Sequence, residues 1–290
     1  MPQPSTFSIV AYDKQTKEWG IAVASKFPAV GAIVPWAKAG AGAVSTQAFA
    51  NTSFGPAGLE LMTEGLSAQD TLARLLENDP EREHRQIGLV DAVGEAASFT
   101  GKECFQWAGG LAGDGYAVQG NILSGPQVAP TMQSAFVDSA GDFSSRLYAA
   151  LLAGDRAGGD KRGRQSAAIL VVQDKGGYGG FNDRKLDYRV DDDIDPISRL
   201  GELIYLHHLY FEKSPKNDIV YLKDDVVVRI KRLMQQLGYF KGEIDGEYNN
   251  ETRSAFREFI GNENFEERAS PSDGWIDRPI LDYLFKKYGS

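Results

Sequence analysis

The chain has 290 residues and a net charge of −9 at neutral pH, with 42% hydrophobic and 24% charged residues. That composition is typical of a globular protein, and the length allows two domains, each with a core of its own. The excess of acidic residues argues against nucleic acid or an anionic membrane surface as a partner. No segment approaches the roughly 20 consecutive apolar residues of a membrane span. We therefore expect neither a nucleic-acid partner nor a membrane partner.

The few cysteines and histidines indicate a reducing compartment and no metal site. Cys104 is the single cysteine, so it cannot form a disulfide within the chain. His207 and His208 are adjacent and His84 is far from them, which is not the spacing of metal ligands. The start, MPQPSTFSIVAYDK, lacks the basic segment and apolar core of a secretory signal, and no glycine-rich nucleotide motif follows a strand. The sequence thus predicts a cytoplasmic protein without a metal or a cofactor.

The first expected element is a β-hairpin over residues 6–26. Its first half, TFSIVA, alternates between polar and apolar residues, and its second half, GIAVAS, is apolar on both faces. A strand that is apolar on both faces indicates a central position in a buried sheet. The hairpin places Thr6 at its entrance and Ser25 and Lys26 at its exit.

Strands and helices then follow in blocks. Ser67, with Asp70 three residues later, is a helix-start signal, and Asp142 could cap a further helix. Because strands and helices form separate runs, we predict an α+β layered domain rather than a doubly wound parallel sheet. In chain order the expected elements are a glycine-rich strand layer over 27–50, helices over 54–65 and 67–80, strands over 86–100 and 115–125, helices over 131–159, a strand over 167–172, and a short strand and a long helix within 187–213.

A polar segment over residues 214–225 is the predicted linker between a first domain, residues 1–213, and a second, residues 226–290. Beyond the linker, apolar residues recur at helical spacing. Asn249 or Asn250 caps a second helix, and the closing residues form a third after a turn. We therefore expect the second domain to be a small all-α unit of three helices.

The sharpest candidate for chemistry is Thr6. A hydroxyl at the start of a first strand, with Lys26 returning beside it, is an arrangement suited to acyl transfer, because a nearby ammonium lowers the nucleophile's pKa or stabilises an oxyanion. Ser8 shares the strand face of Thr6 by the period-two rule and is the weaker alternative. An ordinary strand threonine and a solvated lysine are the structural alternatives.

Carboxamides and hydroxyls at other strand ends are candidates for binding a substrate. Gln119 and Asn121 alternate on one expected strand and could form an oxyanion hole, although the same residues could simply form a bulge or turn. Thr46 and Gln47 end another expected strand and could donate to a substrate carbonyl. Alternatively, this pair only satisfies hydrogen-bonding groups at the end of the sheet.

A glycine-rich loop carries the charged candidates. Arg162 and Arg164 could clamp a substrate carboxylate in a bidentate way, with Asp160 beside them. The alternative is an Arg–Asp network that pins the loop. The acids within residues 191–195 could hold a hard cation, but they lack the glycine-spaced loop of a calcium site, so solvated acids and a helix cap are favoured.

The first domain resembles the domain of unknown function 1028 family. The resemblance runs from Thr6 to about Leu206 and implies a fold similar to the N-terminal-nucleophile hydrolases, a four-layer αββα sandwich with a nucleophile at the start of its first strand. The family usually continues with His after RVDD, whereas this chain has Asp193. The matching stretches are TFSIVAYD, GIAVASK, STQAF, RQIGLVD, CFQWAG, QGNIL, AGGDKRGRQSAAILVV and RVDDDIDPI.

The second domain resembles a small peptidoglycan-binding module. The matching stretch is LGYFKGEIDGEYNNETRSAFREF, in which Asp245 and Gly246 form the tight turn. The resemblance implies peptidoglycan fragments as a partner. Four aromatic residues could provide a floor for sugars or peptide stems, although such residues are more often core: Tyr239, Phe240, Tyr248 and Trp275. In a cytoplasmic protein the module would instead serve as a protein-interaction or dimer surface.

Together these features favour a hydrolase-like protein acting on a small amide or peptide-like molecule. An N-terminal-nucleophile enzyme uses its own free α-amine as base, so residues 1–5 would have to be removed to activate Thr6. The alternative is a non-catalytic ligand- or peptidoglycan-binding protein on a hydrolase-like scaffold, because fold alone does not give function. A homodimer is expected only because symmetric dimers are common.

Overall fold

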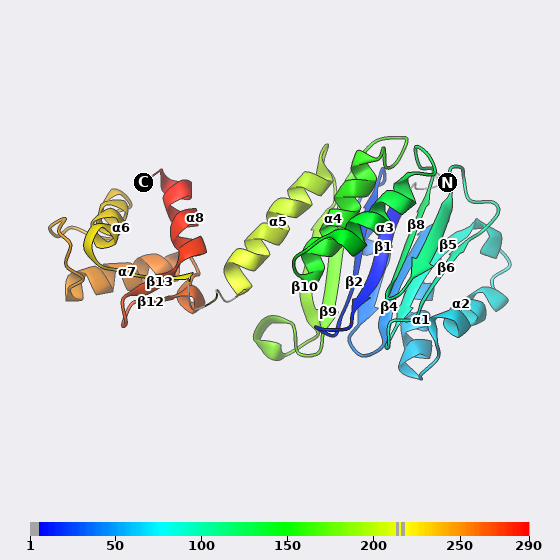
Figure 1. Ribbon diagram of the computed structural model, residues 1–290, viewed down its shortest axis with the longest axis horizontal. Coiled ribbons are helices and arrows are strands. Elements are labelled where there is room, and N and C mark those ends of the chain that lie inside the picture. Colours follow the sequence, from blue (N-terminus) through cyan, green and yellow to red (C-terminus); the bar gives the residue numbers. More distant parts are fainter. Residues whose placement is uncertain (1–5, 213–214, 216–217, 290) are drawn as a thin grey trace. The chain divides into compact units, whose positions relative to one another are not determined.

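The computed structural model describes residues 6–212, 215 and 218–289 (Figure 1). The chain divides into two compact units, one up to Ile204 and one from Tyr205 onward. The first unit is of mixed α+β type with antiparallel sheets, as the sequence predicts. No helix of the described residues is long and apolar enough to cross a membrane.

The larger sheet of the first unit has six antiparallel strands in the order β10-β9-β2-β1-β8-β7. The expected hairpin is present at its centre, where Thr6 pairs with Ser25 and Asp13 with Glu18. The strands are β1 (Thr6–Asp13), β2 (Glu18–Ser25), β7 (Gly109–Gly113), β8 (Tyr116–Asn121), β9 (Ser166–Gln173) and β10 (Arg184–Val190).

The smaller sheet faces the larger one and has four antiparallel strands in the order β3-β4-β5-β6. Side chains from both sheets, among them Val10, Ile21, Ala43 and Val90, form one buried apolar cluster between them. The strands are β3 (Pro35–Lys38), β4 (Gly42–Ala48), β5 (Arg85–Asp91) and β6 (Ala96–Thr100).

Helices cover the outer face of each sheet (Figure 1). Two predicted caps are present: the Ser67 side chain accepts from the backbone N–H of Asp70, and Asp142 accepts from that of Ser145. Each satisfies an N–H that has no partner within its helix. The helices are α1 (Phe54–Thr63) and α2 (Ala68–Glu77) on the smaller sheet, α3 (Val128–Asp138) and α4 (Phe143–Arg156) on the larger, then α5 (Pro196–Phe211), with short 3₁₀ turns η1 (Val30–Ala32), η2 (Arg82–His84) and η3 (Tyr178–Gly180).

The alternation of β1 assigns its side chains to two different interiors. Phe7, Ile9 and Ala11 pack into the cluster under α3 and α4, whereas Val10 lies in the cluster between the sheets. Thr6 and Ser8 have the same parity as Val10, so they also face the smaller sheet. The polar residues of the first strand are therefore inside the sandwich and not on its surface.

The second unit is not all-α, so that part of the prediction is wrong. A three-stranded antiparallel sheet, β11-β13-β12, accompanies the three expected helices. Its strands have only two or three residues, too few to show alternation in the sequence, and β11 pairs with the distant β13, whereas β12 and β13 are neighbours in the chain. The elements are β11 (Ile219–Tyr221), α6 (Asp224–Gln236), α7 (Asn250–Asn262), η5 (Glu266–Arg268), β12 (Ala269–Ser270), β13 (Trp275–Asp277) and α8 (Arg278–Tyr288).

The division between the units falls within α5, earlier in the chain than the expected linker. Leu209 is buried in the core of the second unit, with Leu206 and Tyr210 packed against it. Of the expected linker over 214–225, β11 occupies three residues and α6 begins at Asp224, while residues 214, 216 and 217 lie outside the described residues. Of the two candidate caps of the second helix, Asn249 is the one that accepts from the Thr252 N–H.

A buried ion pair ties the end of α5 to the small sheet. Arg268 and Asp277 are 3% and 5% exposed, and the Arg268 Nε donates to an Asp277 carboxylate oxygen at 2.5 Å. Nη1 of Arg268 also donates to the carbonyl oxygens of His208 and Leu209. These carbonyls belong to the last turn of α5, where helix carbonyls commonly lack a partner within the helix, and the His208 carbonyl also accepts from the Glu212 N–H at 3.1 Å.

We expect Asp277→Asn to destabilise the second unit by about 3 kcal/mol, because it leaves the buried Arg268 charge without its counter-ion. The matched control is Asp282→Asn, at an exposed position of α8, which should change stability by less than about 0.5 kcal/mol. Urea unfolding of the full chain measures both values. Equal effects of the two substitutions would show that the pair does not stabilise this unit.

Candidate functional site

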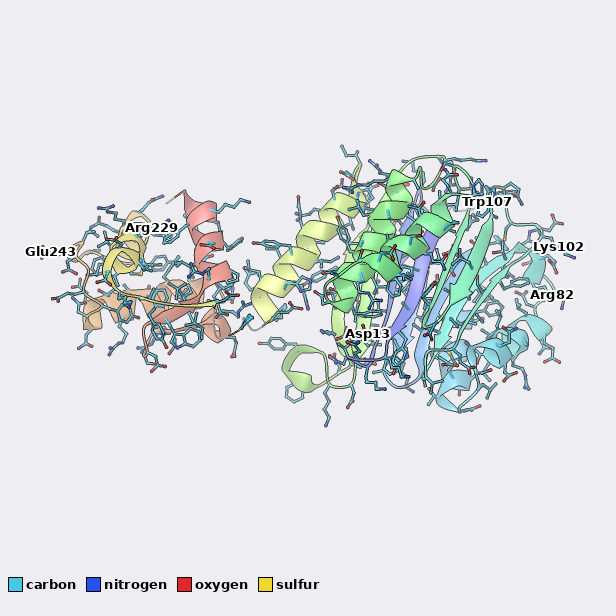
Figure 2. All side chains as sticks on the ribbon, viewed as in Figure 1. Asp13, Arg82, Lys102, Trp107, Arg229 and Glu243 are labelled. Atoms are coloured by element: carbon cyan, nitrogen blue, oxygen red, sulfur yellow. The ribbon has the colours of Figure 1, made fainter. Side chains whose placement is uncertain are left out.

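A row of uncharged polar side chains crosses the space between the two sheets at one end. On the larger sheet Thr6 lies opposite Ser25 of β2 and Asn121 of β8, and on the smaller sheet Gln47 lies opposite Gln86. All five residues are at most 2% exposed. Figure 2 labels Trp107 near this end of the sandwich, while Asp13 marks the other end of β1.

The Thr6 hydroxyl is held inside this row. Its Oγ1 lies 3.2 Å from the Oγ of Ser25, and its backbone carbonyl accepts from Gln47 Nε2 at 3.3 Å. Because Gln47 belongs to the opposite sheet, the start of β1 is bonded to both sheets at once. The structure thus brings together three of the predicted site residues, Thr6, Gln47 and Asn121.

Gln86 is the central member of the row, and sequence reasoning did not single it out. Its Oε1 accepts from Gln47 Nε2 at 2.8 Å and from Asn121 Nδ2 at 3.0 Å. Its Nε2 donates to the Gly120 carbonyl at 2.8 Å and to Thr100 Oγ1 at 2.9 Å. A glutamine directly before the apolar run IGLV of β5 was the available signal in the sequence.

Ser8 and Gln119 form a second polar layer, one row further in. Ser8 Oγ donates to Gln47 Oε1 at 2.6 Å and accepts from Gln119 Nε2 at 2.6 Å, with Ser45 Oγ at 2.8 Å. The Gln119 carboxamide lies against Gly88, where a Cβ atom would come 2.1 Å from Oε1. Gln119 therefore orients Ser8 in this structure instead of facing an open oxyanion position.

Lys26 does not approach Thr6, which corrects the sequence-based expectation. Ser25 is the residue whose side chain meets Thr6, and neighbours along an extended chain point to opposite sides. The Lys26 side chain is exposed and its Nζ donates to the Arg164 carbonyl at 3.2 Å. Lys26 is thus held by the loop that contains Arg164 and not by the polar row.

The side chains of Thr46 and Gln47 point to opposite faces of β4. Gln47 points between the sheets, whereas the Thr46 hydroxyl donates to the Asn51 carbonyl at 3.2 Å, and Thr46 is fully buried. The hydroxyl satisfies the end of β4 and the loop after it, which was the structural alternative for this residue.

The arginines of the glycine-rich loop are bonded to acids of the same chain. Arg164 makes two hydrogen bonds of 2.7 Å to Asp155, and this contact raises the pKa of the Arg164 guanidinium. Arg162 pairs with the buried Asp160 at 3.1 Å, and Asp160 also accepts from the Lys26 backbone N–H at 2.8 Å. The structure shows the Arg–Asp network that was the alternative to a free carboxylate clamp.

A small cavity lies between the glycine-rich loop and the helix-covered face of the larger sheet, where Phe7 and Ala24 line it. Its volume is about 10 Å³, which accommodates about one water molecule. Because Thr6 faces the smaller sheet, this cavity and the Thr6 side chain lie on opposite faces of β1. The polar lining residues are Ser25, Ser166, Asp155, Asp160 and Arg164.

Cys104 behaves as a buried small residue. Burial raises the pKa of its thiol to about 11, and its Sγ donates to the Arg85 carbonyl at 3.3 Å. A thiol with so high a pKa is protonated at neutral pH and is a poor nucleophile.

Arg85, next to Gln86, fixes the start of β5 in the smaller sheet. Its side chain donates to Asp79 at 2.7 and 3.2 Å, to Glu81 at 3.0 Å and to the Phe49 carbonyl at 2.7 Å. The hydrogen bond from Arg85 lowers the pKa of the Asp79 carboxyl. The strand that carries Gln86 is therefore anchored by an ion pair outside the polar row.

Two family models match the chain. Residues 6–200 match the family of unknown function DUF1028, and residues 210–284 match a domain described as "Putative peptidoglycan binding domain". No match was found among curated proteins.

One solved structure belongs to the same family as this chain. The crystal structure of protein SPO2555 from Silicibacter pomeroyi, a DUF1028 member, is 32% identical with a TM-score of 0.65, over 70% of this chain and 86% of that one. Anbu (ancestral beta-subunit) from Yersinia bercovieri aligns at 9% identity with a TM-score of 0.32, over 72% and 98% of the two chains, a similarity too low to carry an argument.

We expect Gln86→Met to destabilise the first unit by about 3 kcal/mol, because the buried amides of Gln47 and Asn121 would both lose their acceptor. Gln15→Met, at an exposed position, should cost less than about 0.5 kcal/mol. Urea unfolding of the two variants tests this. A Gln86 variant as stable as the wild type would mean that the carboxamide row is not a stabilising network.

We expect the stabilising effect of Asp79 to depend on pH. Because its folded pKa is lowered, the effect is present above its unfolded pKa of about 3.9 and is lost as the pH falls through the folded pKa. Asp79→Asn should therefore cost about 1 kcal/mol at pH 7, allowing for solvent screening, and progressively less below about pH 4. Urea unfolding between pH 7 and 3 measures the gap, with the exposed Asp114→Asn as control. A gap that widens toward low pH would contradict this assignment.

Proposed function

The chain belongs to the DUF1028 family, whose function is unknown, and we propose from the geometry of the first unit that this unit is an amide hydrolase with Thr6 as nucleophile. The observation that carries the proposal is the position of Thr6. It begins a central strand, it lies opposite Ser25 and Asn121 of the two neighbouring strands, and its hydroxyl lies 3.2 Å from that of Ser25 at the polar end of the space between two sheets.

The layered arrangement supports this proposal. Two antiparallel sheets that face each other, with helices on both outer faces, are similar to the sandwich of N-terminal-nucleophile hydrolases. In such enzymes the nucleophile starts a central strand and its own α-amine is the general base.

The proposed mechanism needs the α-amine as its general base because of the composition of the polar row. Among the described residues that hydrogen-bond within the row, the side chains are hydroxyls and carboxamides, which do not accept a proton near neutral pH. Lys26 is directed to the Arg164 carbonyl. Cleavage before Thr6 would supply the missing base at the required place, although residues 1–5 lie outside the described residues.

The reaction then has a simple balance. Thr6 Oγ1 attacks the substrate's amide carbonyl, the α-amine takes the hydroxyl proton, and the C–N bond breaks as that proton passes to the leaving amine. Water, deprotonated by the same amine, hydrolyses the acyl ester and restores Thr6. Asn121, which lies opposite Thr6 in register, would donate to the oxyanion through its carboxamide.

Other residues of the site have supporting roles in this proposal. Gln47 and Gln86 hold Thr6 and Asn121 in position, and Gln119 orients Ser8. Arg164 would bind a substrate carboxylate by exchanging Asp155 for it.

A second candidate function concerns the second unit. The match of residues 210–284 to a peptidoglycan-binding domain favours glycan binding there. The substrate of the first unit and the ligand of the second would then be separate molecules or separate parts of one polymer.

We expect the protein isolated from its own host to begin at Thr6. We also expect the Thr6→Ala variant to hydrolyse N-acyl amino-acid p-nitroanilide probes about 10³-fold more slowly than the wild type. Thr6→Ser should retain measurable activity, and Thr16→Ala, an exposed threonine, should match the wild type. Intact mass with N-terminal sequencing and an amidase assay provide the readouts. A chain that still begins at Met1 or Pro2 would leave Thr6 without its base and overturn the mechanism.

A further inference from the structure

One face of the small three-stranded sheet carries two aromatic side chains in direct cross-strand register. Tyr221 of β11 lies opposite Trp275 of β13, and Trp275 in turn lies opposite Ser270 of β12. Opposite residues share a face, so the three side chains form one row. The alternate residues Ile276 and Ala269 belong to the core of the second unit.

The aromatic side chains of this row are accessible to solvent, whereas the alternate residues on the opposite face of the sheet are buried. Tyr221 is 60% exposed and Trp275 is partly exposed, whereas Ile276 is fully buried. Large aromatic rings that stay at the surface beside polar groups mark binding sites more often than isolated apolar residues do.

The other aromatic residues expected to form a sugar-binding floor are used for packing. Phe240 is 2% exposed, and the Tyr239 ring packs against Phe259. Tyr248 donates its hydroxyl to the Pro271 carbonyl at 2.9 Å, and burial raises the pKa of Tyr248 to about 12. Of the four expected residues, Trp275 is the one that shares a face with Tyr221.

A turn with polar side chains leads directly into Trp275. Ser270 Oγ lies 3.0 Å from Ser272 Oγ and donates to the Asp273 carboxylate at 2.7 Å. Gly274, with φ of 67°, lies against Tyr248, where a Cβ atom would come within 3.1 Å of the ring. The hydroxyls and the carboxylate are thus held close in the chain to Trp275, and Ser270 lies opposite it in the sheet.

We propose that Tyr221 and Trp275 form a stacking platform for a sugar ring of a glycan strand, with Ser270, Ser272 and Asp273 bonding the sugar's hydroxyl and amide groups. The inference rests on the proposed glycan binding of the second unit. A pyranose ring has a flat face of C–H groups and a polar edge, which fits aromatic rings beside hydroxyls and a carboxylate. The carboxylate and the net charge of −9 disfavour an acidic ligand, so the occupant is the neutral glycan and not an acidic peptide stem.

The test uses the full chain with two probes: insoluble peptidoglycan sacculi and the soluble β-1,4-linked tetramer of N-acetylglucosamine. We expect Tyr221→Ala and Trp275→Ala each to raise the dissociation constant for both probes about tenfold, as loss of a central aromatic does at binding surfaces. Tyr221→Phe, which keeps the ring, should bind like the wild type. The matched control is Tyr178→Ala, an 85% exposed aromatic of the first unit, and circular dichroism verifies that each variant is folded.

Each outcome decides a separate point. A wild type that does not sediment with sacculi overturns the glycan-binding function itself. A wild type that binds while Tyr221→Ala and Trp275→Ala bind as well as Tyr178→Ala overturns the platform alone. Binding to sacculi without binding to the tetramer assigns recognition to the peptide stems and overturns the sugar-ring assignment.

Discussion

The fold of the first unit depends on the hydrogen bonds made by the polar groups that are buried between its two sheets. A carboxamide removed from water without hydrogen bonds costs free energy, so every one at this interface constrains its neighbours. Gln86 accepts from both sheets through Gln47 and Asn121 and donates to the Gly120 carbonyl. A slip of one residue in either sheet would break these bonds and turn the side chains to the other face. The network therefore fixes the register of β1, β4, β5 and β8 together.

The same network limits what chemistry is possible. Its members are neutral, which lets them stay buried without the desolvation cost of charges, and for that reason they cannot serve as a proton acceptor. The charged groups of the nearby loop are paired with acids, Arg164 with Asp155 of α4 and Arg162 with Asp160. A nucleophile in the row needs a base brought from outside it, which is why the proposal depends on a new chain terminus at Thr6.

The sequence predicted features that depend on neighbours in the chain. The β1–β2 hairpin followed from alternation, and the caps at Ser67 and Asp142 followed from side chains within three residues of their targets. It did not predict Gln86 as the centre of the site, because the partners of that residue come from β4, β6 and β8. The direction of Lys26 follows from alternation along an extended chain, because Ser25 is the residue opposite Thr6, so this miss did not depend on distant contacts. The sheet of the second unit was missed because its strands are very short and because β11 pairs with the distant β13, which local pattern does not encode.

The two proposed activities are compatible because peptidoglycan contains both kinds of group, a glycan strand and amide-linked peptide stems. A unit that holds the strand would raise the local concentration of amides around the other unit, an effect set by the connecting chain and needing no contact between the units. Weak stacking on one sugar at Tyr221 and Trp275 would then suffice, since a polymer offers many equivalent sugars. On this argument a small, shallow platform is the kind of site to be expected in a unit that the chain joins to a proposed hydrolase.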